Sequence, residues 1–101
     1  VIKQVIEYIE ENFTQDIRLE QLASIFHYNP CYLNSLFRHY QGINIHHFLL
    51  RKRLTVAEQL LKTGNYQIKE VAYQVGFKDP LYFTRVFRKY KGLSPSKLKR
   101  K

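Results

Sequence analysis

The sequence contains one cysteine, no tryptophan and no methionine among its 101 residues. The single thiol, Cys31, can form no disulfide within the chain and cannot supply the ligands of a cysteine-based zinc finger. No apolar run approaches the roughly 18 to 20 residues needed to cross a bilayer, and no signal-peptide pattern opens the chain. We therefore expect a cytoplasmic protein without disulfides and without a membrane partner.

Patterns typical of catalysis, metal binding or cofactor binding are also missing. The chain has four histidines, but the adjacent His46 and His47 would point about 100° apart on a helix, and no carboxylate stands at ligand spacing. No hydroxyl, histidine and carboxylate set, no pair of acids and no glycine-rich phosphate loop can be assembled. We expect no enzyme, no metal site and no cofactor.

Acidic residues are scarce, and most of them lie at one end of the chain. There are 17 lysines and arginines against 8 aspartates and glutamates, a formal net charge of +9. Five of the acids fall in residues 1–20, so residues 21–101 hold 15 basic and 3 acidic side chains. This excess indicates a polyanionic partner such as double-stranded DNA. Charge alone leaves open a basic helical module that docks on an acidic protein or on a membrane surface.

Apolar residues recur at helical spacing throughout and predict an all-α fold of about seven helices. The expected helices cover residues 1–13, 19–26, 30–40, 44–63, 68–75 and 80–90, with a short last helix from Pro95. Three of the starts pair a capping residue with a proline in the first helical position, as in Asn29-Pro30 and Asp79-Pro80. Asn44 can cap the long fourth helix, and Gly42 and Gly92 suit the left-handed helix stop.

The chain contains one structural unit twice. An offset of 50 aligns six identical pairs, namely Pro30/Pro80, Tyr32/Tyr82, Phe37/Phe87, Arg38/Arg88, Tyr40/Tyr90 and Gly42/Gly92. The preceding helices align at an offset of 49, with Ala23 on Ala72, so one turn has gained a residue. Each unit reads as two helices joined by a tight turn, which is a helix-turn-helix, although an ordinary helical hairpin repeat is the alternative. The expected division is 1–43, a linker helix 44–63, and 64–101.

Helical spacing also predicts which faces of the second helix in each unit are buried. The expected buried stripes are Leu33, Leu36, Phe37 and Tyr40 in one unit, and Phe83, Val86, Phe87 and Tyr90 in the other. The expected outward sets are Cys31, Asn34, Ser35 and Arg38, and Leu81, Thr84, Arg85 and Arg88. The two outward sets match position by position.

A recognition helix reads base edges with its N-terminal residues. The candidate base contacts are therefore Cys31, Asn34, Ser35, Leu81, Thr84 and Arg85. Arg85 could bond both guanine O6 and N7, Asn34 would favour adenine, and Leu81 could meet a thymine methyl. The candidate phosphate contacts are Arg38, Arg51, Arg53, Lys78, Tyr82, Arg88, Lys89 and Lys91. Such contacts position a protein on DNA without selecting sequence.

The second unit resembles the signature segment of the AraC/XylS transcription regulators, from Ile68 to Phe77 and from Tyr82 to Pro95. Arg53, followed by Ala57, Leu60 and Leu61, resembles the linker helix of that family. The resemblance implies two helix-turn-helix subdomains that place recognition helices in successive major grooves on one DNA face. It also implies transcription activation through RNA polymerase, and a ligand-binding, dimerising or receiver domain upstream. The start without methionine is interpreted as that of an excised or processed piece.

Two features depart from the family pattern. Arg18 stands where the family often has a Ser or Thr cap, so Asp16 or a water must serve the second helix. Cys31 and Ser35 are small where a strong base reader might be expected to stand. The first unit is therefore expected to read less sequence than the second, or to read it through shape and water.

Overall fold

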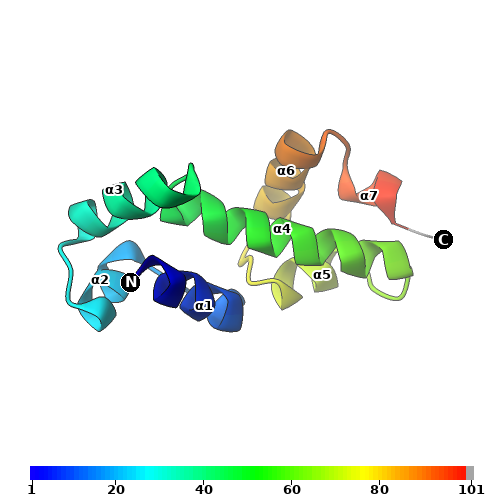
Figure 1. Cartoon of the computed structure of the whole chain (residues 1–101). Helices are drawn as coiled ribbons and strands as arrows, with labels where there is room; N and C mark the ends of the chain where they lie inside the picture. Colours follow the sequence, from blue (N-terminus) through cyan, green and yellow to red (C-terminus); the bar gives the residue numbers. More distant parts are fainter. Residues whose placement is uncertain (100–101) are drawn as a thin grey trace. The chain divides into compact units, whose positions relative to one another are not determined.

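In the computed structural model, which describes residues 1–99, every regular element is a helix and no strand is present (Figure 1). The helices are α1 (Ile2–Asn12), α2 (Leu19–Phe26), α3 (Pro30–Gln41), α4 (Ile45–Thr63), α5 (Ile68–Gln74), α6 (Pro80–Lys91) and α7 (Pro95–Leu98). The predicted all-α fold of about seven helices is confirmed. Among the described residues, no helix combines the length and the apolar character that a membrane span requires.

The chain divides into two compact units, Val1–Lys52 (unit 1) and Arg53–Lys101 (unit 2). Helix α4 runs through this division and is continuous from Ile45 to Thr63. The predicted three-part division at residues 43/44 and 63/64 follows the helices rather than the compact units, and it stays a prediction.

Unit 1 closes around the apolar faces of its first three helices and the start of α4. Helices α1 and α2 both pack against α3. The buried cluster consists of Val5, Ile9, Leu22, Ala23, Leu33, Phe37, Ile45 and Leu49. The ring of Phe37 meets that of Phe48 edge to face at 5.3 Å between centroids. Burial of a side chain such as Phe37 is the main source of stability for a unit of this size.

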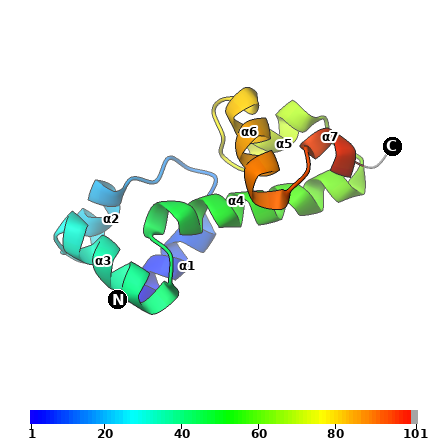
Figure 2. The ribbon, with the colours of Figure 1, turned by 90° about the horizontal axis from the view of Figure 1, so that it is seen from above.

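Unit 2 repeats this construction with α5 and α7 packed against α6 (Figure 2). Its buried side chains include Leu54, Ala57, Leu61, Val71, Ala72, Val75, Val86 and Pro95. A run of three aromatic rings lines the interior, with centroids 5.1 Å apart for Phe77 and Phe83 and 5.6 Å apart for Phe83 and Phe87. Ala23 and Ala72 are both buried, as close crossing of the two helices in each motif requires.

The predicted starts and stops of α3 and α6 are confirmed, whereas Ser94, the third predicted cap, makes no side-chain capping bond at the start of α7 among the described residues. The Asn29 carboxamide oxygen accepts the Tyr32 N–H at 3.2 Å, and the Asp79 carboxylate accepts the Leu81 N–H at 3.0 Å. Asn44 caps α4 by accepting the His47 N–H at 2.9 Å. Gly42 and Gly92 both end their helices at a φ of 82°. These local bonds fix where the second helix of each motif begins and ends.

The turn inside each motif is closed by the same backbone bonds. Tyr28 N–H donates to the Ala23 carbonyl at 2.8 Å, and Phe77 N–H donates to the Ala72 carbonyl at 2.9 Å. His27 and Gly76 occupy the same place and both have a positive φ, 62° and 102°. Unit 2 has one more residue between this turn and the proline of the next helix, as the change of offset indicated.

We expect His27→Gly to stabilise unit 1. A residue with a Cβ in the left-handed conformation costs roughly 1 to 2 kcal/mol, and the change to glycine removes that cost. Glycine also has more conformational freedom in the unfolded chain, which offsets part of this stabilisation, so the net gain should be about 0.5 to 1 kcal/mol. The measurement is the free energy of unfolding in urea. Gly76→Ala is the matched control and should be destabilising; a loss of stability in His27→Gly would contradict the strain argument.

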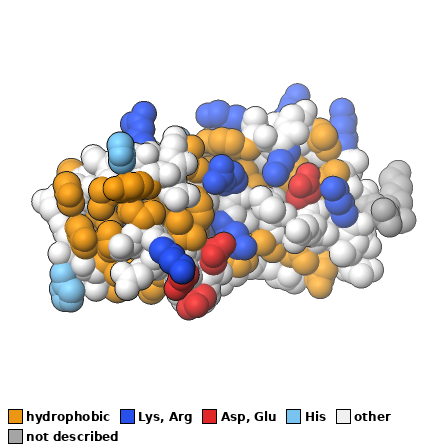
Figure 3. Space-filling model, in the orientation of Figure 1, with side chains coloured by type: hydrophobic (Ala, Val, Ile, Leu, Met, Phe, Trp, Pro, Cys, Tyr) orange, Lys and Arg blue, Asp and Glu red, His pale blue; other side chains and the backbone are white. Residues whose placement is uncertain are grey.

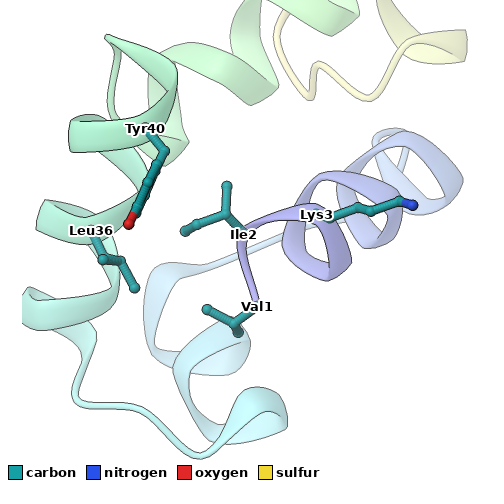
Figure 4. Close-up of a pocket in the computed structure, with 5 residues that line it drawn as sticks. All are labelled: Val1, Ile2, Lys3, Leu36 and Tyr40. Carbon is teal, nitrogen blue, oxygen red and sulfur yellow. The ribbon is translucent and has the colours of Figure 1, made fainter.

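The expected burial of Tyr40 and Tyr90 is wrong, since these side chains are 65% and 49% exposed. Apolar side chains reach the surface of unit 1 (Figure 3). Tyr40 is one of the large exposed hydrophobic side chains of the described residues. With Leu36, Val1, Ile2 and Lys3 it lines an open pocket of about 390 Å³ between the start of α1 and the end of α3 (Figure 4). Both tyrosines stand in the last turn of their helices, where the neighbouring helices do not cover them.

The start of α2 also differs from those of α3 and α6. Its N-cap residue, Arg18, makes no side-chain capping bond within residues 1–99. The Arg18 guanidinium instead donates to the Asp16 carboxylate at 3.3 Å. Glu20 stands in the first turn, where a negative charge stabilises the positive end of the helix dipole.

Candidate nucleic-acid interface

The outward faces of α3 and α6 have the same pattern of exposure at corresponding positions. Cys31, Ser35 and Arg38 are exposed on α3, and Leu81, Arg85 and Arg88 are exposed on α6. Leu81 is the extreme case, with 77% of its surface accessible. Asn34 and Thr84, which correspond to each other, are partly buried in both units. Each helix therefore presents a face of small, apolar or basic groups that it does not need for its own packing.

The two partly buried candidates already use polar atoms within the protein. The Asn34 amide oxygen accepts the N–H of Ile45 at 3.1 Å, across eleven positions of the sequence. The Thr84 hydroxyl donates to the Pro80 carbonyl at 3.0 Å, one turn earlier on the same helix. Neither bond was visible in the helical spacing of the sequence. These bonds compete with any contact that the same atoms could make to a base.

An exposed tyrosine stands in the first turn of α3 and of α6. Tyr32 is 58% exposed and stacks on Tyr28 with 6.0 Å between centroids and 7° between planes. Tyr82 is 41% exposed and lies 6.1 Å from Phe77. Sequence reasoning singled out Tyr82 but missed Tyr32, although the repeat offset of 50 aligns the two. Both tyrosines are exposed in the first turn of the second helix of their motif.

The predicted phosphate-binding cations fall into three environments. Arg38, Arg88 and Lys89 are exposed in the later turns of α3 and α6, and Lys78 is exposed in the turn before α6. Arg51 is exposed on α4, with its guanidinium 5.5 Å above the Phe48 ring. A cation held over an aromatic ring in this way keeps its charge and its outward donors.

Arg53 and Lys91 are less accessible. The Arg53 guanidinium lies 5.7 Å from the centre of the Phe77 ring, in the turn of the second motif, and the residue is partly buried. The Lys91 ammonium lies 3.8 Å from a carboxylate oxygen of Glu58, and both side chains are largely covered. Arg53 links α4 to the turn of the second motif, and Lys91 links α6 to α4. Both cations therefore contribute to the packing of unit 2, whatever else they contact.

Basic side chains are the most visible charged groups on the face of unit 2 seen in Figure 3, whereas the same view of unit 1 shows mainly hydrophobic side chains. In the part of the chain that the structure describes, no group of three histidine, cysteine or acidic side chains is placed to hold a metal ion. The surface thus offers cations and hydrogen-bond donors, which suit a phosphate backbone.

A family model described as a helix-turn-helix domain matches residues 22–101. The regulatory protein PocR of Salmonella typhimurium is 34% identical over 94 residues, which make up 93% of this chain and 31% of PocR. Three curated relatives, PocR among them, are covered over 31%, 33% and 45% of their length. The chain therefore spans less than half the length of each of these proteins.

Two solved structures have the same arrangement of helices. The C-terminal domain of AraT, a response regulator from Geobacillus stearothermophilus, matches with a TM-score of 0.93 and 32% identity over 98% of this chain and 83% of that one. The DNA-binding domain of AdpA, solved in complex with a target DNA, matches with a TM-score of 0.89 and 27% identity over 95% and 86%.

Proposed function

Because the chain belongs to the AraC-type helix-turn-helix family of transcription regulators, we propose that it binds double-stranded DNA in a sequence-specific manner, with α3 and α6 as recognition helices in successive major grooves. The observation that carries this proposal is the repeated outward face, which has the same exposure at corresponding positions of the two helices. When one face of a helix is buried in the core of its own unit, the opposite face can enter a DNA groove without a rearrangement of the protein.

The base contacts are proposed to be unequal between the two units. In unit 2, Arg85 can bond a guanine through two donors, and the exposed Leu81 can pack on a thymine methyl. In unit 1, Cys31 and Ser35 are exposed but small. Thr84 keeps only its acceptor capacity, since its hydrogen is donated to Pro80. Unit 2 therefore supplies most of the direct base reading.

The phosphate contacts are assigned to the exposed cations and hydroxyls around the recognition helices. These are Arg38, Arg51, Lys78, Tyr82, Arg88 and Lys89, together with Tyr32, which corresponds to Tyr82. Arg53 and Lys91 are weaker candidates because their charged groups already have partners in unit 2. Contacts of this kind add affinity for any DNA and make it depend on salt.

The regulatory role of the whole protein is inferred from its relatives. Both AraT and a yesN response regulator of Fusobacterium nucleatum provide neighbouring structures that are C-terminal domains. An upstream sensor, dimerisation or receiver domain fits this, as does the partial coverage of PocR. Activation of transcription through RNA polymerase, in the cytoplasm where bacterial DNA lies, is the proposed outcome of binding.

Selection from a pool of randomised duplexes tests the proposal. The protein should enrich a defined site and bind it about 10³-fold or more tightly than a scrambled duplex. Raising the salt concentration should weaken binding to both, because released counterions drive the shared phosphate contacts. Equal affinity for selected and scrambled DNA would count against sequence-specific binding.

Anionic vesicles and an acidic protein serve as controls in the same assay. They address the alternative of a basic module that docks on another charged surface. Binding to these partners as tightly as to the selected duplex would favour that alternative over DNA recognition.

A further inference from the structure

The first turn of α4 depends on a side chain from the recognition helix of unit 1. An α-helix starts with N–H groups that have no partner inside the helix, and they must be satisfied from outside. At the start of α4, Asn44 accepts the His47 N–H at 2.9 Å, while the Asn34 oxygen on α3 accepts the Ile45 N–H at 3.1 Å. Ile45 as a residue is only 4% exposed, and Asn34 supplies the acceptor for its N–H.

The orientation of the Asn34 amide follows from this bond. A backbone N–H can only donate, so the atom that faces it must be the carboxamide oxygen rather than the nitrogen. Asn34 also lines a pocket of about 220 Å³ together with residues that begin α2 and α4, including Leu19 and His46. The amide thus lies beside the starts of α2 and α4, whereas the exposed Cys31 and Ser35 do not line this pocket.

At the start of α7, unit 2 needs no side-chain acceptor from α6. The repeat places Thr84 at the position of Asn34 and Pro95 at the position of Ile45. Pro95 is the first residue of α7 and has no N–H to satisfy. Thr84 accordingly bonds within its own helix, to the Pro80 carbonyl. A bond from this position to the next helix is needed in unit 1, where Ile45 has an N–H, and is not needed in unit 2, where Pro95 has none.

We propose that Asn34 is a positioning residue that ties the recognition helix α3 to the first turn of α4, rather than a reader of adenine. The proposal rests on the proposed DNA-binding function, and it refines which residues of α3 read the target. An adenine contact uses the oxygen and the NH₂ group of the amide together. Turning that amide toward DNA would break its bond to the N–H of Ile45, and the cost of losing this bond offsets what the base contact would contribute.

A double-mutant cycle on the isolated chain tests the bond without DNA. Asn34→Ala should raise the unfolding equilibrium constant about fivefold to thirtyfold, because it removes the acceptor that bonds the Ile45 N–H. Asn34→Asp keeps an oxygen acceptor in place and should change the unfolding equilibrium constant less than about threefold. In an Ile45→Pro background, which copies the pairing of unit 2, Asn34→Ala should change the constant less than about twofold. Equal effects of Asn34→Ala in both backgrounds would overturn the proposal.

The second readout is base preference, measured by selection from randomised duplexes for the four chains of the cycle. In the Ile45→Pro background, adding Asn34→Ala should leave the selected sequence unchanged and alter affinity for it less than about twofold. Loss of an adenine from the selected site in both backgrounds would show that Asn34 reads a base and would overturn the proposal. If the unmodified chain selects no sequence, the proposed function fails, while the unfolding measurements still decide whether Asn34 holds α4.

Discussion

Replacing Arg85 with alanine is expected to remove discrimination at one base pair of the target while leaving affinity for unrelated DNA nearly unchanged. Arg85 is exposed near the start of α6, in the position from which a recognition helix reaches base edges. Its guanidinium can donate two bonds to guanine, and such a pair is worth about 1 to 3 kcal/mol, or roughly fivefold to 150-fold in affinity. Competition binding with the selected site and with the same site altered at each base pair measures the effect.

Lys89→Ala is the matched control on the same helix. Lys89 is also exposed and basic, but it lies one turn later, with its ammonium 5.7 Å from the centre of the Tyr90 ring. Its removal should weaken all sequences alike and lower the slope of log affinity against log salt by about 1. Equal losses on selected and scrambled DNA for both variants would refute the division into base and phosphate contacts.

The second large effect is expected from Phe37→Ala, which should destabilise unit 1 by about 3 to 5 kcal/mol. Phe37 is fully buried, and its ring packs on that of Phe48 at 5.3 Å. Its loss removes apolar contacts and leaves a cavity that the surrounding helices cannot close. A domain of this size has only about 5 to 15 kcal/mol of stability in total, so the variant should unfold at much lower urea concentration.

Tyr40→Ala provides the contrast from the same helix, one turn further on. Because Tyr40 is 65% exposed, its truncation should cost less than about 1 kcal/mol. Phe87→Ala, at the corresponding buried position of unit 2, should be as damaging there as Phe37→Ala is in unit 1. A small loss of stability in Phe37→Ala, or a large one in Tyr40→Ala, would contradict the burial of Phe37 and the exposure of Tyr40.

The helices could be predicted from the sequence because their boundary signals are local. The starts of α3 and α6 are indicated by Asn29 before Pro30 and by Asp79 before Pro80. The capping bonds are present at both places. Gly42 and Gly92 state where those helices end. The repeat supports both motifs, because the boundary signals of one recur at a fixed offset in the other.

The accessibility of helix ends and the partners of polar groups could not be predicted in the same way. Helical spacing gives the direction of Tyr40, but whether anything covers it depends on Val1 and Ile2, which are remote in sequence. The bond from Ile45 to Asn34 joins residues eleven positions apart on different helices, and no periodicity encodes it. The outward face of Arg85 followed from spacing alone, whereas the DNA contacts proposed for it await measurement.

Within α3 and α6, the side chains that pack into each unit lie on one face of the helix and the exposed side chains on the other, and Asn34 and Thr84 stand between the two faces with bonds inside the protein. The exposed residues of either helix can therefore be substituted with little effect on the packing of its buried residues. New binding preferences should be reachable through one or two substitutions at a time, each passing through a folded intermediate. Such a domain can drift between targets during evolution, and the same separation makes it a suitable scaffold for engineered regulators.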